Sequence, residues 1–298
     1  MQTTIRTKPT KYRSLDAAAC VRRYLRGTWL AVGIAIVLVL VTAGVFLTHT
    51  QELSLWLYLF LILLILAGYT VVIGLRAMEL YHILYTDCDP VKFLEILQRL
   101  QKKTKRARAR NTLHLQCALT LSYLNDWDGA YRELTQFRAD RCRNRNLKLS
   151  HLNLLGDYCL AKDQKEDFEA CRSQLLALTA EGKPREKKLA DEILMVWDRR
   201  IACILQDREK ERELLNQLLS QKRYLIQQVT WTFRLAQLDL LEGERINARE
   251  RLKTVREYGN TLTLRAWAEE IWNAQGFACE QEENQKETGE INNGNDTE

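Results

Sequence analysis

Two long uncharged apolar runs near the start of the chain constrain its fold more than any other feature. Residues 27–51 contain no Asp, Glu, Lys or Arg, and a second such run extends from Ser54 to Leu75, just before Arg76. A membrane-spanning helix needs about 20 apolar residues, and each run reaches that length. Neither run has the polar face that a helix at the surface of a soluble protein carries. The sequence therefore predicts a transmembrane helical hairpin over residues 29–76.

Three alternatives to this hairpin can be weighed on the same residues. A helical pair buried in a soluble domain is disfavoured because neither run has a polar side. A cleaved signal peptide is disfavoured because the first run exceeds the usual apolar region of about 7–15 residues. The basic lead before the first run is also typical of a mitochondrial presequence, being rich in Arg and poor in acids. We keep the uncleaved hairpin as the main interpretation.

The distribution of Lys and Arg indicates the orientation of the hairpin. Seven of these residues precede the first run, none lies in the link between the runs, and many follow Arg76. Short loops rich in Lys and Arg stay in the cytosol. We therefore expect an integral protein of the plasma membrane with two spans and both termini cytosolic, in which residues 1–28 form a basic cytosolic segment.

The composition of the remaining chain favours an all-α fold. Among 298 residues there are 13 Gly and 3 Pro, well below the usual shares of about 7% and 5%. None of the eight Cys forms a CxxC pair, and their spacing indicates neither a zinc site nor a disulfide framework. A reducing compartment fits this use of cysteine best.

A helix start is predicted where the second apolar run ends. Asp89 before Pro90 is typical of an N-cap followed by the first helical position. This capping role explains Asp89 and makes the alternative, a DxD metal or nucleotide-sugar site at residues 87–89, improbable. The helix that follows has one apolar face, formed by Phe93, Leu94, Leu97 and Leu100.

A basic cluster follows this predicted helix. Arg99 leads into a run for which we expect contact with lipid or another anion: Lys102, Lys103, Lys105, Arg106, Arg108 and Arg110. A basic run close to a membrane attracts anionic headgroups by about 1 kcal/mol per charge. It could instead be a solvated stretch that only reinforces topology. Nucleic acid is disfavoured as a partner because no aromatic residues interleave the charges.

The rest of the chain repeats itself with a period of about 40 residues, which lies in the range of helical repeats. Small residues twelve positions apart recur in three copies, and we align Cys159 of the second copy and Ala236 of the last copy with Ala118 of the first. A degenerate copy around residues 197–204 and 211–219 has no assignable register. The residues expected to pack within the repeats are Ala118, Trp127, Ala130, Leu134, Cys159, Phe168, Cys171, Leu175, Ala236, Gly243, Ala248 and Leu252.

This pattern resembles the tetratricopeptide repeat (TPR). The best matches are YLNDWDGAYREL and LLEGERINARERL, each with a turn that contains Gly, Asn or Asp followed by Ala and a large apolar residue. The period is longer than the usual period of that family, and the closing Pro is missing. The resemblance implies a solenoid of helical hairpins over residues 77–279 that binds a protein through its concave surface. The matched positions are expected to pack the core and not to bind.

The C-terminal part holds two tryptophans and an acidic tail. Trp267 and Trp272 are expected either to cover the last repeat as a capping helix or to contact a partner, because Trp is enriched in binding hot spots. Residues 280–298 are acidic and nearly free of apolar side chains, which predicts disorder.

The sequence carries no motif of a known catalytic or cofactor site. It lacks HExxH, GxSxG, GxGxxG and GxxxxGK[ST]. We therefore expect no enzymatic activity, no cofactor and no metal. The leading hypothesis is a membrane-tethered scaffold or adaptor that binds a cytosolic or membrane protein. The alternatives are a regulator that binds lipid or RNA through residues 99–110, and an enzyme whose site is built from scattered residues.

Overall fold

The computed structural model describes residues 10–48, 55–221 and 224–277. Over these ranges the regular secondary structure consists of twelve α-helices and no strand, so the predicted all-α class is confirmed. The predicted disordered tail, residues 280–298, and the link between the two apolar runs lie outside the described residues.

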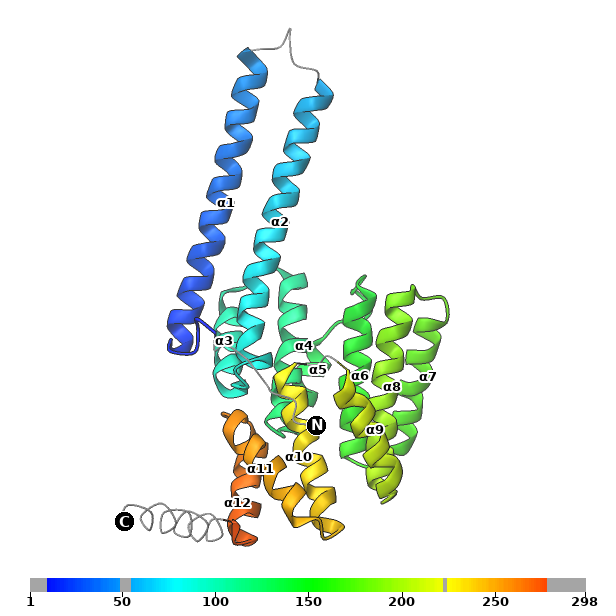
Figure 1. Cartoon of the computed structure of the whole chain (residues 1–298). Coiled ribbons are helices and arrows are strands. Elements are labelled where there is room, and N and C mark those ends of the chain that lie inside the picture. Colours follow the sequence, from blue (N-terminus) through cyan, green and yellow to red (C-terminus); the bar gives the residue numbers. More distant parts are fainter. Residues whose placement is uncertain (1–9, 49–54, 222–223, 278–298) are drawn as a thin grey trace, which may run out of the picture.

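The first two helices, α1 (Ala17–Thr48) and α2 (Leu55–Tyr85), lie side by side and project from the rest of the molecule (Figure 1). Large apolar side chains along them are exposed, including Trp29 at 72% and Trp56 at 80%. The most apolar 18-residue stretch of each helix has no buried residue. A buried helical pair of a soluble domain would be covered by other elements. Both helices are long and apolar enough to span a membrane.

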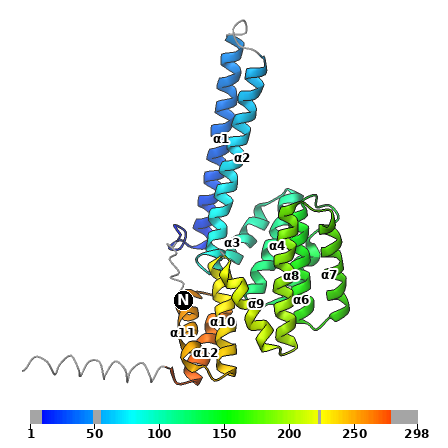
Figure 2. The same cartoon turned by 45° about the vertical axis from the view of Figure 1, so that its right-hand side comes forward.

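The remaining helices form what we call the helical domain, residues 90–277. A single helix, α3 (Pro90–Lys103), precedes four helical hairpins, and one helix, α12 (Thr263–Ala274), follows them (Figures 1 and 2). The hairpins are α4 (Ala107–Tyr123) with α5 (Trp127–Gln136), α6 (Arg145–Ala161) with α7 (Lys165–Ala180), α8 (Pro184–Ile204) with α9 (Arg208–Ser220), and α10 (Leu225–Leu241) with α11 (Arg245–Tyr258).

The same three-residue turn closes all four hairpins. In each turn, the residue that follows the middle residue donates its backbone N–H to the carbonyl of the residue five positions before it. Asp126 N donates to Leu121 O at 3.0 Å, and Glu244 N donates to Asp239 O at 2.8 Å. The middle residue has a positive φ, which Gly, Asn and Asp adopt most easily. These middle residues are Asn125 (59°), Asp163 (54°), Gln206 (58°) and Gly243 (79°). They fix the register of every hairpin.

The turns correct the predicted register of the second copy. Ala118 lies seven positions before the middle turn residue of its hairpin, and the same place in the second hairpin belongs to Gly156 and not to Cys159. A side chain at Gly156 would meet the Trp197 ring, with its Cβ 2.7 Å from Cε2. The two buried cysteines of this hairpin suggested the wrong alignment because thiols are also small. The alignment of Ala236 with Ala118 in the last copy agrees with the turns.

The third hairpin is degenerate in sequence because a buried ion pair replaces its two small residues. The positions equivalent to Ala118 and Ala130 hold Arg199 and Glu211, whose Nη1 and Oε1 atoms are 3.6 Å apart. Glu211 is 1% exposed, and Arg234 of α10 donates to both of its oxygens, at 2.8 and 2.9 Å. Burial lowers the pKa of Arg199 to about 10.

The residues predicted to pack within the repeats fall into three environments. Trp127 is half-buried at the start of α5, where its Nε1 donates to Asn125 Oδ1 at 2.9 Å and the Arg200 guanidinium lies 5.1 Å from its ring centroid. Gly243 is exposed in a turn, so its assignment to packing is wrong. The others are buried: Ala118, Ala130, Leu134, Cys159, Phe168, Cys171, Leu175, Ala236, Ala248 and Leu252.

The predicted helix start at Asp89 is present, and the chain segment before α1 packs beside it. The Asp89 side chain accepts a bond from Lys92 N at 3.1 Å, with Pro90 at the first turn of α3. Asp87 instead accepts a bond from Thr10 N at 3.1 Å. Tyr12 is buried, and Lys92 Nζ donates to its carbonyl at 2.7 Å. Residues 10–28 are thus part of the folded base of the apolar helices.

The end of the helical domain returns to this base. The largest core of the described chain joins residues from α1, α2 and α3 to residues from α10, α11 and α12. Asn260 Nδ2 donates to Asp87 O at 2.8 Å, and Thr261 Oγ1 donates to Asp89 Oδ1 at 2.7 Å. These contacts hold the helical domain in one orientation relative to α1 and α2.

Candidate anion-binding surface

The connections between the helices lie at two opposite ends of the helical domain. The α3–α4, α5–α6 and α7–α8 connections lie at the end from which α1 and α2 project, here called the proximal end (Figure 1). The four three-residue turns lie at the opposite, distal end (Figures 1 and 2). The proximal connections and the distal turns are therefore exposed to different surroundings.

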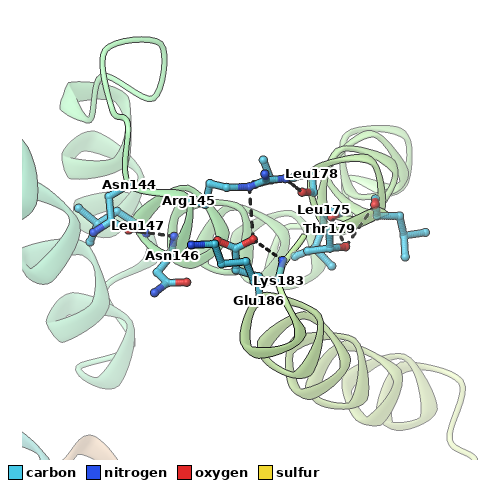
Figure 3. Close-up of polar contacts among 10 residues, drawn as sticks. Asn144, Arg145, Asn146, Leu147, Leu175, Leu178, Thr179, Lys183 and Glu186 are labelled. Atoms are coloured by element: carbon cyan, nitrogen blue, oxygen red, sulfur yellow. Dashed lines mark hydrogen bonds and ion pairs between the residues drawn. The ribbon is translucent and has the colours of Figure 1, made fainter. Parts of the chain in front are cut away.

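Side-chain contacts join the proximal connections into one surface. Asn111 at the start of α4 accepts a bond from Arg138 N at 2.6 Å and donates to Arg138 O at 3.4 Å. Arg145 at the start of α6 donates to Leu178 O, and its Nε lies 3.5 Å from Glu186 Oε2 (Figure 3). The same carboxylate accepts a bond from Lys183 N at 3.0 Å. The first pair joins α4 to the α5–α6 connection, and the other contacts join α6 to α7 and α8.

The two ends differ in charge. Around the proximal connections, residues 102–110 hold six Lys and Arg and no acid, residues 138–145 hold four Arg and one Asp, and residues 183–188 hold four Lys and Arg and one Glu. The four distal turns, residues 124–126, 162–164, 205–207 and 242–244, hold five acidic residues and one Lys. The proximal end is thus basic and the distal end is acidic.

The proximal surface contains a basic groove of about 990 Å³, lined mainly by side chains of α3, α4 and the α5–α6 connection. At its edge, His114 Nδ1 lies 2.7 Å from Glu133 Oε2. Within the described part of the chain, Lys102, Lys105 and Arg108 form no ion pair. The cations that line the groove are Lys102, Lys105, Arg108, Arg110, Arg138, Arg141 and Arg143.

A smaller hollow of about 480 Å³ connects the basic groove to the first apolar helix. It lies between α1 and α3 and is lined by Arg22 together with Arg99, Lys102 and Lys103. Arg22 precedes Trp29 by seven residues, which is about 10 Å of helix. Lys102 lines both the hollow and the groove. The groove therefore adjoins a hollow that α1 lines next to its apolar stretch.

Comparison of the chain with models of known protein families, with curated proteins and with solved structures finds no match. Over the described ranges, no three His, Cys, Asp or Glu side chains gather as a metal site requires.

The basic cluster predicted from the sequence is only partly gathered in the groove. Lys102, Lys105, Arg108 and Arg110 line it, whereas Lys103 lines only the smaller hollow and Arg106 lines neither. Three further arginines of the groove, residues 138, 141 and 143 of the α5–α6 connection, lie outside the cluster predicted from the sequence. The alternation of basic residues in RADRCRNR was the signal for them, but this run lies far along the chain from the apolar helices.

The two C-terminal tryptophans face the core. Trp272 is 1% exposed, and its ring centroid lies 5.4 Å from that of Phe277, so its assignment as a partner contact is wrong. Trp267 is half-buried against the same core. Exposed large apolar side chains occur instead in and beside two distal turns, at Ile204, Leu205 (72%), Leu241 and Ile246 (81%).

Proposed function

We propose that this protein is a membrane-tethered adaptor. Helices α1 and α2 anchor it in the plasma membrane with both termini in the cytosol. The basic proximal end of the helical domain rests on the cytosolic leaflet, and the distal end faces the cytosol and binds a protein partner. One observation carries the proposal: a domain held in one orientation by contacts such as Asn260 to Asp87 has a basic end toward its apolar helices and an acidic end away from them.

Electrostatics support the proposed orientation. The cytosolic leaflet carries anionic lipid and attracts basic segments next to a membrane span. Lys and Arg also stay on the cytosolic side during insertion. The basic residues of segment 11–26 and those of the proximal end lie on the same side of the anchor, so both effects favour one topology.

Apolar side chains support a protein partner at the distal end. Leu205 and Ile246 are exposed in or beside turns that carry acidic residues. Large exposed apolar side chains bordered by charge are typical of protein interfaces. The resemblance of the sequence to TPR points to the same class of function. In this proposal the protein acts by positioning its partner and not by catalysis.

Photocrosslinking in native membranes tests the adaptor function. A photoreactive residue at position 205 or 246 should give a discrete protein adduct, whereas one at the proximal Lys187 should give none. Leu205→Asp combined with Ile246→Asp should abolish the adduct. Lys253→Asp, an exposed change on α11, should leave it unchanged. Absence of adducts from both distal positions, or adducts that persist in the double variant, would refute the proposal.

A topology assay tests the orientation separately. A reporter peptide that is modified only outside the cytosol, inserted between α1 and α2, should be modified. The same peptide added at the C-terminus should remain unmodified. The reverse pattern would refute the cytosolic placement of the helical domain.

A further inference from the structure

We propose that the basic groove binds a phospholipid headgroup that carries more than one phosphate, supplied by the leaflet in which the protein is anchored. The chemistry it recognises is a compact anion of several charges. This inference rests on the proposed orientation of the helical domain, because only that orientation brings headgroups to the groove.

The cations of the groove suit phosphate. The guanidinium group is a planar fork that binds two phosphate oxygens at once. Arg108 of α4 lines the same groove as Arg138 and Arg143 of the α5–α6 connection, and none of the three forms an ion pair within the described chain. Arg141 has only a distant carboxylate partner, with its Nε 3.8 Å from Asp140 Oδ2. The arginines are therefore available to a ligand.

The size of the groove favours a headgroup of several phosphates over a single ion. Ligand sites measure about 300–1,000 Å³, and the groove reaches about 990 Å³. A single phosphate ion would contact a small part of such a volume. A headgroup with two or more phosphates could engage arginines on both walls at once.

Contacts among protein groups shape the groove before any ligand arrives. The two hydrogen bonds between Asn111 and Arg138 hold α4 against the α5–α6 connection. Arg110 Nη2 donates to Thr104 O at 3.2 Å, which fixes the α3–α4 connection. The nearest carboxylate beside His114 belongs to Glu133, and it also accepts a bond from Gln101 Nε2 at 3.3 Å. The Glu133 carboxylate therefore already has hydrogen-bond partners within the protein.

The position of the groove favours a lipid over other anions. Lys102 is shared with the hollow beside Arg22, and Arg22 lies about 10 Å along α1 from Trp29, so the groove adjoins a hollow next to the apolar stretch of α1. Nucleic acid is disfavoured because no Phe, Tyr or Trp lines the groove, and single strands are bound largely by stacking on aromatic rings.

The test uses the full chain in lipid nanodiscs. Phosphatidylinositol bisphosphate in phosphatidylcholine is compared with phosphatidylserine at the same total charge, and lipid retained by the protein is measured by native mass spectrometry. The groove variant combines Arg108→Gln, Arg141→Gln and Arg143→Gln. The matched control combines Arg185→Gln, Lys187→Gln and Lys188→Gln, which removes equal charge from the proximal end outside the groove. Circular dichroism checks that both variants fold.

We expect selective retention of the bisphosphate lipid by the natural chain. The groove variant should lose about a hundredfold of this preference for the bisphosphate lipid over phosphatidylserine, because it loses three charge-assisted contacts to phosphate. The control should change the preference less than about fivefold, because unspecific surface attraction acts equally on two lipids of the same total charge. Equal losses in the two variants, or equal retention of phosphatidylserine, would overturn the groove as a site. Equally tight binding of soluble inositol trisphosphate to the detergent-solubilised protein would identify a free anion as the ligand and overturn the lipid.

The outcome is separable from that of the adaptor proposal. The groove variant retains Leu205 and Ile246, so it should still give the distal photoadducts. Loss of lipid binding with retained adducts supports both proposals. Unchanged lipid binding with retained adducts refutes the groove alone.

Discussion

Replacing Gly156 with Ala tests the packing of α6 against α8. The added Cβ would lie 2.7 Å from Trp197 Cε2 and 3.1 Å from Cη2, and it would lie closer still to Cζ2. Trp197 is fully buried, and its ring meets that of Phe168 edge to face at a centroid distance of 5.2 Å. The ring has no exposed side toward which it can move, so the methyl group must push α6 and α8 apart.

Two opposing effects set the change in the free energy of unfolding that Gly156→Ala causes. Ala is favoured over Gly within a helix by about 1 kcal/mol. Overpacking a close-packed core costs about 1–3 kcal/mol, and the short contact with a buried ring places this case near the upper end of that range. The net loss is about 2 kcal/mol. For a domain of about 150–250 residues, this corresponds to a fall in Tm of about 4–8 °C.

The assay is thermal unfolding of the full chain in detergent, followed by near-ultraviolet circular dichroism. Trp197→Phe provides the matched background because it removes ring atoms that the methyl group would meet. In that background Gly156→Ala should be neutral or stabilising by up to about 1 kcal/mol. A Gly156→Ala variant as stable as the natural chain, or the same change in both backgrounds, would refute the reasoning.

Three further predictions concern the turns, the buried ion pair and pH. Gln206→Gly should stabilise the chain and Gly243→Gln should destabilise it, because both positions have positive φ. Each change in the free energy of unfolding should be about 1 kcal/mol in denaturant unfolding. Changes of the same sign would show that the two turns are not equivalent. Glu211→Ala should cost about 3–5 kcal/mol because it leaves Arg199 buried without its partner, and Arg199→Ala added to it should recover part of this loss by rebuilding an Ala–Ala pair. Burial lowers the pKa of His151 below its usual value of 6.5, so the unfolded chain binds a proton that the folded protein resists. Stability should therefore fall as pH falls below 6.5, by at most about 1.4 kcal/mol per pH unit. His151→Phe should remove this pH dependence in unfolding curves measured across pH. A variant with the same pH dependence as the natural chain would contradict this role of His151.

The parts of the fold that follow from local chemistry were predictable from the sequence. The uncharged runs, the Asp89 cap and the all-α class each depend on residues close together in the chain. The register of the second and third hairpins was not predictable in this way. It depends on Asp163 and Gln206 taking a positive φ in their turns, and on a buried ion pair standing where the first and last copies have alanine.

The candidate site was predictable only where its residues lie close together in the sequence. The basic residues of segment 102–110 follow soon after the second apolar run, and four of them line the groove. The opposite wall comes from arginines of the α5–α6 connection, which the contact of Asn111 with Arg138 brings into place. The burial of Trp272 likewise depends on tertiary packing, because α12 packs against α11, where the Arg256 guanidinium lies 4.2 Å from the centroid of the Trp272 ring.

Depth-dependent fluorescence quenching measures the orientation of the helical domain most directly. A fluorophore is placed at one of two exposed positions, 106 in the α3–α4 connection or 164 in the α6–α7 turn, in full chains held in nanodiscs with a quencher on the lipid headgroup. We expect strong quenching at position 106 and weak quenching at position 164. Equal quenching at the two positions, or stronger quenching at 164, would contradict a basic end that rests on the membrane.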